Sequence, residues 1–195
     1  MKQQISFQQY RSIDLTIMAV MLAFSQFAIH MASSFWFPEQ LYVVSPVAAV
    51  TALVMMRWSG YGAIHAVLGG LLFTALAGGT WQQFLIYGAG NLFAMAALVM
   101  FKLFGKERIR LSATLSLTFA LAVQLLMQLG RAAIAGLLGF AADACIGFIT
   151  TDALSGLFTL FVIWVARRVA GLFEDQKNYL LRIERERQLE GRDQF

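Results

Sequence analysis

The sequence is poor in the residues that build disulfides and metal clusters. Its 195 residues include one cysteine, two histidines and two prolines. The single cysteine, Cys145, excludes a disulfide within the chain, and His30 and His65 lie far apart in the sequence. No metal-ligand spacing is present. We therefore expect no metal site and no cofactor bound by this chain.

Charged residues are also scarce, at 13% of the chain, where soluble domains carry about a quarter. Hydrophobic residues make up 59%, and the mean hydropathy is +0.67. Several apolar segments reach about 18 residues, the length at which a helix crosses hydrocarbon, and none alternates as the strands of a membrane barrel do. The composition predicts an all-α, multi-pass integral membrane protein.

The common catalytic motifs are missing as well. The chain has no GxxxxGK[ST], HExxH or GxSxG sequence. Asp143 and Asp152 are too isolated to indicate a paired-carboxylate catalyst. We expect the chain not to be an enzyme.

The apolar pattern predicts six transmembrane helices within a domain covering residues 1–170. A charged tail at 171–195 is expected to form a short polar helix outside the membrane. Ser12 before Asp14 resembles a helix cap with an acid in the first turn. The predicted spans are about 14–34, 41–56, 61–77, 84–104, 111–138 and 145–168, of which the second is short and has Pro46 in its first turns.

The basic residues predict the orientation. With both termini in the cytoplasm, the three outer turns contain no Lys or Arg, which is the positive-inside pattern of a cell-membrane protein. The net charge of +4 then reflects orientation and requires no nucleic acid partner. The residues placed inside are Lys2, Arg11, Arg57, Lys102, Lys106, Arg108, Arg110, Arg167, Arg168 and those of the tail.

Two charged residues interrupt apolar runs, Arg131 in the fifth predicted span and Asp152 in the sixth. Charges at membrane depth are costly unless they face protein or water and have a partner. Arg131 lies about seven residues before the end of its run and Asp152 about seven after the start of its own, so their depths match in an antiparallel pair. They are predicted to form a structural ion pair, to line a ligand cavity, or to do both.

Other polar residues recur on single helical faces. Gln124 and Gln128 share a face with Arg131 on the fifth span. Gln83, Tyr87 and Asn91 share a face of the fourth span, and Gln26 and His30 share a face near the outer end of the first. Their convergence predicts a binding cavity open to the outside, with aromatic residues of the outer turns as a lid or stacking surface. Hydrogen bonds between helices, or an aromatic belt, explain any one set alone. The candidate substrate-binding residues are Gln26, His30, Trp36, Tyr42, Trp81, Gln83, Tyr87, Asn91, Gln128, Arg131 and Asp152.

The segment YRSIDL at 10–15 and the AVMLA segment at 19–23 carry a family resemblance. Together with the chain length and the predicted six spans, they resemble the S components of energy-coupling-factor vitamin transporters over about residues 10–170. Members of that family carry an AxxxA pattern on the first helix. Here Ala19 and Ala23 match it, and flat alanine faces permit close helix packing.

The resemblance implies a substrate-capture subunit that docks through Ala19 and Ala23 on a membrane-embedded T subunit. Two ATPase subunits would use ATP, and the loaded chain would topple in the membrane to deliver its vitamin. The polar residues favour a large, amide-rich, nearly neutral substrate of the cobalamin type. Folate, pantothenate, queuosine-type and pyridoxine substrates remain open. A membrane scaffold of the MreD-like type and a small secondary carrier are the alternatives.

Overall fold

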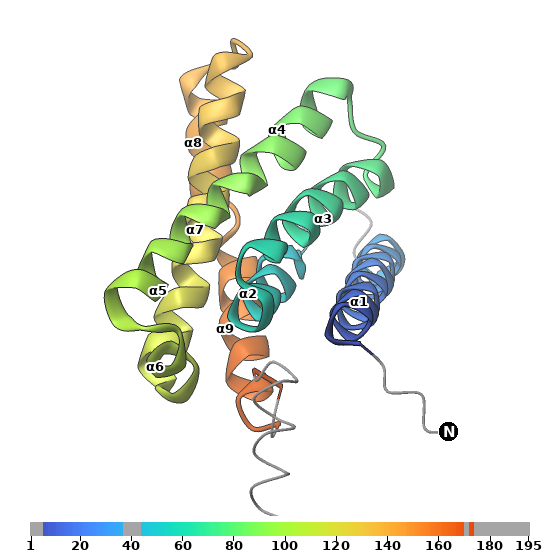
Figure 1. The fold of residues 1–195 in the computed structure, drawn as a ribbon. Helices are drawn as coiled ribbons and strands as arrows, with labels where there is room; N and C mark the ends of the chain where they lie inside the picture. The colour runs from blue at the N-terminus through green and yellow to red at the C-terminus, as the bar shows by residue number, and fades with distance from the viewer. Residues whose placement is uncertain (1–5, 37–43, 170–171, 174–195) are drawn as a thin grey trace, which may run out of the picture.

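The computed structural model describes residues 6–36, 44–169 and 172–173, and every regular element in these ranges is a helix. The predicted all-α class is confirmed for this part of the chain (Figure 1). In order the elements are α1 (Phe7–Trp36), α2 (Val47–Trp58), the 3₁₀ turn η1 (Ser59–Tyr61), α3 (Gly62–Leu76), α4 (Trp81–Asn91), the 3₁₀ segment η2 (Leu92–Leu98), α5 (Val99–Phe104), α6 (Lys106–Leu111), α7 (Ala113–Leu137), α8 (Ala142–Thr150) and α9 (Ala153–Ala166).

Within the described ranges, five helical runs are long and apolar enough to cross a membrane, so the predicted count of six spans is not confirmed. The second run contains two of the predicted spans, 41–56 and 61–77, which correspond to α2 and α3. The chain turns between them at Ser59, which adopts a positive φ of 54°. α3 packs back on α2, with Val47 against Gly69. At 12 and 15 residues, α2 and α3 are each shorter than the ~20 residues of a full span. The runs are Phe7–Trp36, Val47–Leu76, Trp81–Phe104, Ala113–Leu137 and Ala142–Ala166.

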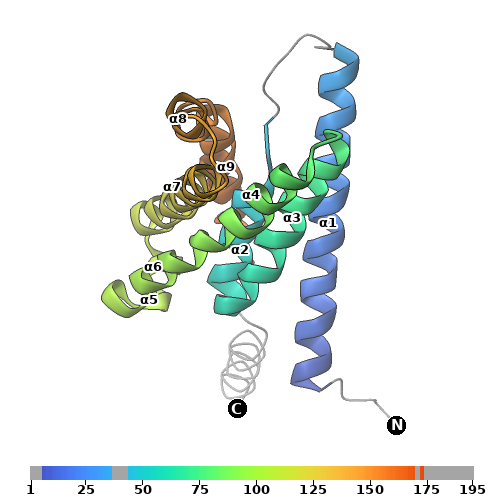
Figure 2. The ribbon, with the colours of Figure 1, turned by 90° about the horizontal axis from the view of Figure 1, so that it is seen from above.

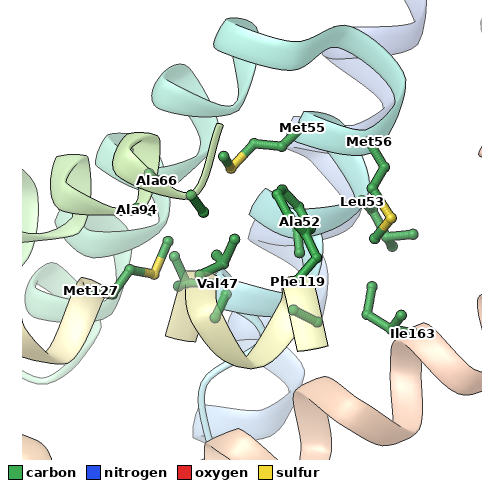
Figure 3. Close-up of a cluster of buried hydrophobic side chains, with 14 of the residues drawn as sticks. Val47, Ala52, Leu53, Met55, Met56, Ala66, Ala94, Phe119, Met127 and Ile163 are labelled. Atoms are coloured by element: carbon green, nitrogen blue, oxygen red, sulfur yellow. The ribbon is translucent and has the colours of Figure 1, made fainter. Parts of the chain in front are cut away.

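The short helix α2 lies at the centre of the bundle. Eleven of its twelve residues are buried, and all of these except Thr51 and Arg57 are apolar. Figure 3 shows its side chains beside Phe119 and Met127 of α7 and Ile163 of α9. Phe119 is fully buried and stacks on Phe101, with ring centroids 4.8 Å apart. α2 therefore organises the core although it is too short to span.

α1 begins at Phe7 rather than at the predicted Asp14. The predicted cap at Ser12 is wrong, because a better cap lies one and a half turns earlier. The Gln9 amide donates to the Ser6 hydroxyl at 3.2 Å, and the Gln9 side chain accepts from the Ser6 amide at 2.9 Å. This reciprocal pair satisfies two donors that would otherwise have no partner at the helix start.

Asp14 instead joins α1 to α2 through a two-point ion pair with Arg57, whose Nε and Nη2 both lie 2.9 Å from its oxygens. The Trp58 indole also donates to Asp14. Two cations from the α5–α6 region then cover the carbonyls at the end of α2. Lys106 Nζ donates to the Arg57 carbonyl at 2.9 Å, and Arg110 Nε donates to that of Met56 at 2.9 Å. Cations are favourable at this end of a helix dipole.

The helix ends that carry basic residues meet on one side of the molecule, which we call the basic end (Figure 1). The α5–α6 turn and the end of α9 lie there, opposite α8 and the start of α4. Arg167 donates to the Leu111 carbonyl at 2.8 Å, and the Arg11 guanidinium lies 4.5 Å from the centre of the Tyr61 ring. The basic end comprises Arg11, Arg57, Lys106, Arg108, Arg110 and Arg167.

The predicted single helix at 84–104 changes its backbone geometry part-way. α4 starts at Trp81, gives way directly after Asn91 to the seven residues of η2, and resumes as α5. Stretches of 3₁₀ helix longer than three or four residues are uncommon within a span.

α7 ends in a Schellman turn in which the Phe140 amide donates to the Ala135 carbonyl at 3.1 Å, and Gly139 adopts the positive φ of 83° that this turn requires. The last run then breaks at Thr151 and Asp152, between α8 and α9. The predicted tail helix at 171–195 lies outside the described residues, except for positions 172–173.

Candidate functional site

The predicted pair of intramembrane charges is present. Arg131 projects from the last two turns of α7, and its Nη1 lies 3.1 Å from Oδ2 of Asp152 at the break between α8 and α9. The side chains are 6% and 18% exposed, respectively. The matched depths of the two residues in an antiparallel helix pair explain this contact. The predicted ion pair is therefore confirmed.

Two amide side chains extend the pair into a buried network. Arg131 Nε donates to Asn91 Oδ1 at 2.8 Å, and Asn91 Nδ2 donates to the Ala66 carbonyl at 2.9 Å. On the other side, Gln124 Nε2 donates to Asp152 Oδ2 at 2.9 Å. The network therefore connects α3, α4, α7 and the start of α9.

Tyr87 covers the cationic end of this network. The Arg131 guanidinium lies 4.8 Å from the centre of the Tyr87 ring, a cation–π distance. Tyr87 in turn contacts Phe73 of α3 at 4.9 Å between ring centroids and Phe148 of α8 at 6.0 Å. We call Tyr87, Asn91, Gln124, Arg131 and Asp152 the Arg131 network.

Glycines at helix crossings bring these side chains together. A Cβ added at Gly90 would lie 2.7 Å from the Arg131 amide nitrogen, and one at Gly130 would collide with the Gly90 carbonyl. Between α3 and α4, a Cβ at Gly70 would collide with the Tyr87 carbonyl. Only glycine permits such backbone approach. The Gly90–Gly130 crossing was not predicted from the sequence.

The charges of the Arg131 network cancel, and donors and acceptors remain for a ligand. A guanidinium has five N–H donors, and the bonds to Asn91 and Asp152 occupy two of them. Asp152 lies at the first position before α9, where a helix dipole favours an anion. Such a site suits a neutral molecule that offers both carbonyl oxygens and N–H or O–H groups.

The remaining predicted site residues do not join the network among the described residues. Gln83 caps α4, accepting from the Thr80 amide at 2.7 Å, because it occupies the third position of that helix. Gln128 is buried one turn before Arg131 without a bond to the network, and Gln26 is buried with Oε1 unpaired within the described ranges. His30 is half-buried, Trp36 and Trp81 are 69% and 63% exposed, and Tyr42 lies outside the described residues.

His65 makes a hydrogen bond between helices. Its Nε2 lies 3.1 Å from the Leu15 carbonyl, so it joins α3 to α1. Beside it, α1 and α3 enclose an apolar groove of about 520 Å³, which we call the α1–α3 groove. Figure 2 shows the two helices side by side. The groove contains both predicted docking residues, and its lining is Ser12, Leu15, Thr16, Ala19, Val20, Ala23, Ile64, His65, Leu68 and Leu72.

Within the described ranges, no group of three or more His, Cys, Asp or Glu side chains is placed to hold a metal ion. Comparison of the chain with protein-family models, with curated proteins and with solved structures finds no match.

Proposed function

We propose that this chain is the substrate-capture subunit of an energy-coupling-factor importer. It binds a water-soluble vitamin outside the cell and has no catalytic activity of its own. The observation that carries the proposal is the Arg131 network, a neutral set of polar side chains from α4, α7 and the start of α9 within an apolar bundle. Residues of this kind at membrane depth are typical of substrate pathways.

The substrate that suits this site is large, nearly neutral and rich in amides, as cobalamin is. Amide carbonyls would accept from the remaining guanidinium donors of Arg131, and amide N–H groups would donate to Asp152. Tyr87 would offer a ring face beside them. A strongly anionic substrate fits less well, because Asp152 already neutralises Arg131.

Docking on a membrane-embedded T subunit is assigned to α1. Ala19 and Ala23 lie half-buried on the wall of the α1–α3 groove, where a partner helix could approach closely. α1 also exposes much of its apolar surface, since only Met18, Leu22 and Gln26 are buried along its 30 residues. An incompletely covered helix suits a subunit that exchanges lipid contacts for partner contacts.

Directional import requires the partner to distinguish loaded from empty subunit. A ligand shifts an equilibrium only through its different affinity for the two states. The ATPase subunits would supply the energy, and the chain would contribute the ligand-dependent affinity while it topples between membrane orientations. Both termini are assigned to the cytoplasm, in accord with the positive-inside pattern.

The test measures vitamin binding by the purified chain and docking on a coexpressed energy-coupling module. Ala19→Trp is expected to abolish copurification with the module while leaving vitamin affinity within twofold. The matched control is Met21→Trp, because Met21 is 59% exposed and does not line the groove. Equal loss of docking in both variants, or loss of vitamin affinity in Ala19→Trp, would contradict the assignment.

A membrane scaffold of the MreD-like type is the second candidate, favoured by the fact that Arg131 and Asp152 already bond to partners within the chain. A scaffold would bind no vitamin and would retain its function when Arg131→Met and Asp152→Asn are combined. A secondary carrier would instead transport in liposomes without any module. The same purified chain distinguishes all three functions.

A further inference from the structure

The α1–α3 groove has the form of a lipid site. α1 and α3 run in the same direction along it, since His65 meets the Leu15 carbonyl and Gly69 faces Leu22 further on. Apart from Ser12, Thr16 and His65, its lining is aliphatic. The Thr16 hydroxyl donates to the Ser12 carbonyl at 2.8 Å and His65 Nε2 bonds to the Leu15 carbonyl, while His65 Nδ1 is buried without a hydrogen-bond partner in the described ranges. The groove therefore presents mainly hydrocarbon.

Its length matches one leaflet of a bilayer. From Ser12 to Ala23 the helical rise gives about 17 Å, and from Ile64 to Leu72 it gives about 12 Å. Half of the hydrocarbon core of a bilayer is about 15 Å thick. A straight acyl chain entering at the Ser12 end would thus be covered along most of its length.

Arg11 places a positive charge near the mouth of the groove. Arg11 immediately precedes Ser12, is half-buried, and holds its guanidinium 4.5 Å from the centre of the Tyr61 ring, a contact that leaves its N–H groups available. Within the described ranges, no carboxylate pairs with Arg11, because the neighbouring Asp14 is engaged by Arg57. The mouth of the groove therefore lies at the basic end, where a phosphate group would meet Arg11.

We propose that the α1–α3 groove binds one anionic phospholipid, with an acyl chain along the groove and the phosphate against Arg11. The inference concerns the chain alone and does not depend on the proposed function. If that function also holds, a partner helix that docks on Ala19 and Ala23 must displace this lipid.

The test is native mass spectrometry of the full chain released from detergent micelles after titration with dioleoylphosphatidylglycerol or dioleoylphosphatidylcholine. We expect one phosphatidylglycerol to bind at concentrations where phosphatidylcholine does not. Arg11→Gln should weaken phosphatidylglycerol binding about fivefold, as expected for one cation near a lipid phosphate. Arg108→Gln, an exposed cation outside the groove, should change it less than twofold.

Filling the groove tests the acyl chain separately. Combining Ala19→Leu with Ala23→Leu should lower lipid affinity more than tenfold, whereas Ala28→Leu, an exposed position on the same helix outside the groove, should not. Circular dichroism would verify folding. If the double variant does not fold, Thr16→Leu, at an exposed position near the mouth, should still lower the affinity.

Three results would overturn the proposal. The first is equal binding of the two phospholipids, and the second is an equal effect of Arg11→Gln and Arg108→Gln, which would indicate general attraction to the basic end. The third is disulfide crosslinking between chains that carry Ala19→Cys in a Cys145→Ser background. That crosslink would show a second copy of the chain in the groove.

Discussion

Replacing Arg131 by Met should destabilise the chain more than replacing Arg131 and Asp152 together. In Arg131→Met the Asp152 carboxylate loses its cation, and breaking a buried pair in this way costs ~3–5 kcal/mol. The lower value applies, because Asp152 is 18% exposed and retains Gln124. Asn91 also loses a donor, at about 1 kcal/mol, and Tyr87 loses its cation, at about 1 kcal/mol.

The single variant is therefore expected to lose about 5 kcal/mol. With Asp152→Asn added, no charge is stranded, and the neutral amide still accepts from Gln124. The loss then falls to about 2 kcal/mol, from Asn91 and Tyr87 alone.

The assay is unfolding of the purified chain in mixed micelles by sodium dodecyl sulfate, followed by far-ultraviolet circular dichroism. Arg108→Met is the matched control, since Arg108 is exposed and should change stability by no more than about 0.5 kcal/mol. A double variant as unstable as Arg131→Met, or less stable, would refute the reasoning. Asp152 would then not depend on Arg131 for its charge.

Other substitutions test the surrounding architecture in the same unfolding assay. Gly130→Ala should cost more than 2 kcal/mol, because its methyl group meets the facing helix backbone, whereas Gly147→Ala, with open space around it, should be neutral or stabilising. Asn91→Leu should cost about 2 kcal/mol, since it removes two buried hydrogen bonds, to Arg131 and to the Ala66 carbonyl. Asp14→Asn should cost about 3 kcal/mol by weakening the ion pair to Arg57; a change below 0.5 kcal/mol would show that α1 is held by packing alone.

The ion pair between Arg131 and Asp152 could be predicted from the sequence because charges are so costly in hydrocarbon. One arginine and one aspartate at matching depths in the membrane had few other partners for their charges. The helical period placed Gln124 and Gln128 on the face of Arg131, and Gln124 does reach Asp152. Asn91 was identified by the same period on another helix, although its partners were not.

What could not be predicted depends on how helices cross and bend. Nothing in the hydropathy of residues 92–98 distinguishes a 3₁₀ segment from an α-helix. The turn at Ser59, in contrast, lies between the predicted spans 41–56 and 61–77. The Gly90–Gly130 crossing was missed because many glycines lie in apolar runs and only the fold pairs them. Gln83 was predicted as a ligand because it shares a helical face with Tyr87 and Asn91. Its place three residues after Thr80 instead indicates a helix cap.

The measurement that tests the proposed function most directly is vitamin binding by the isolated chain in lipid nanodiscs. A panel of vitamins would be titrated against the wild-type chain and against the variant that combines Arg131→Met with Asp152→Asn, after both are shown to be folded. The account predicts saturable binding of one vitamin by the wild-type chain and at least a tenfold loss in the variant. No binding of any vitamin by the folded wild-type chain, or equal binding by both chains, would contradict it.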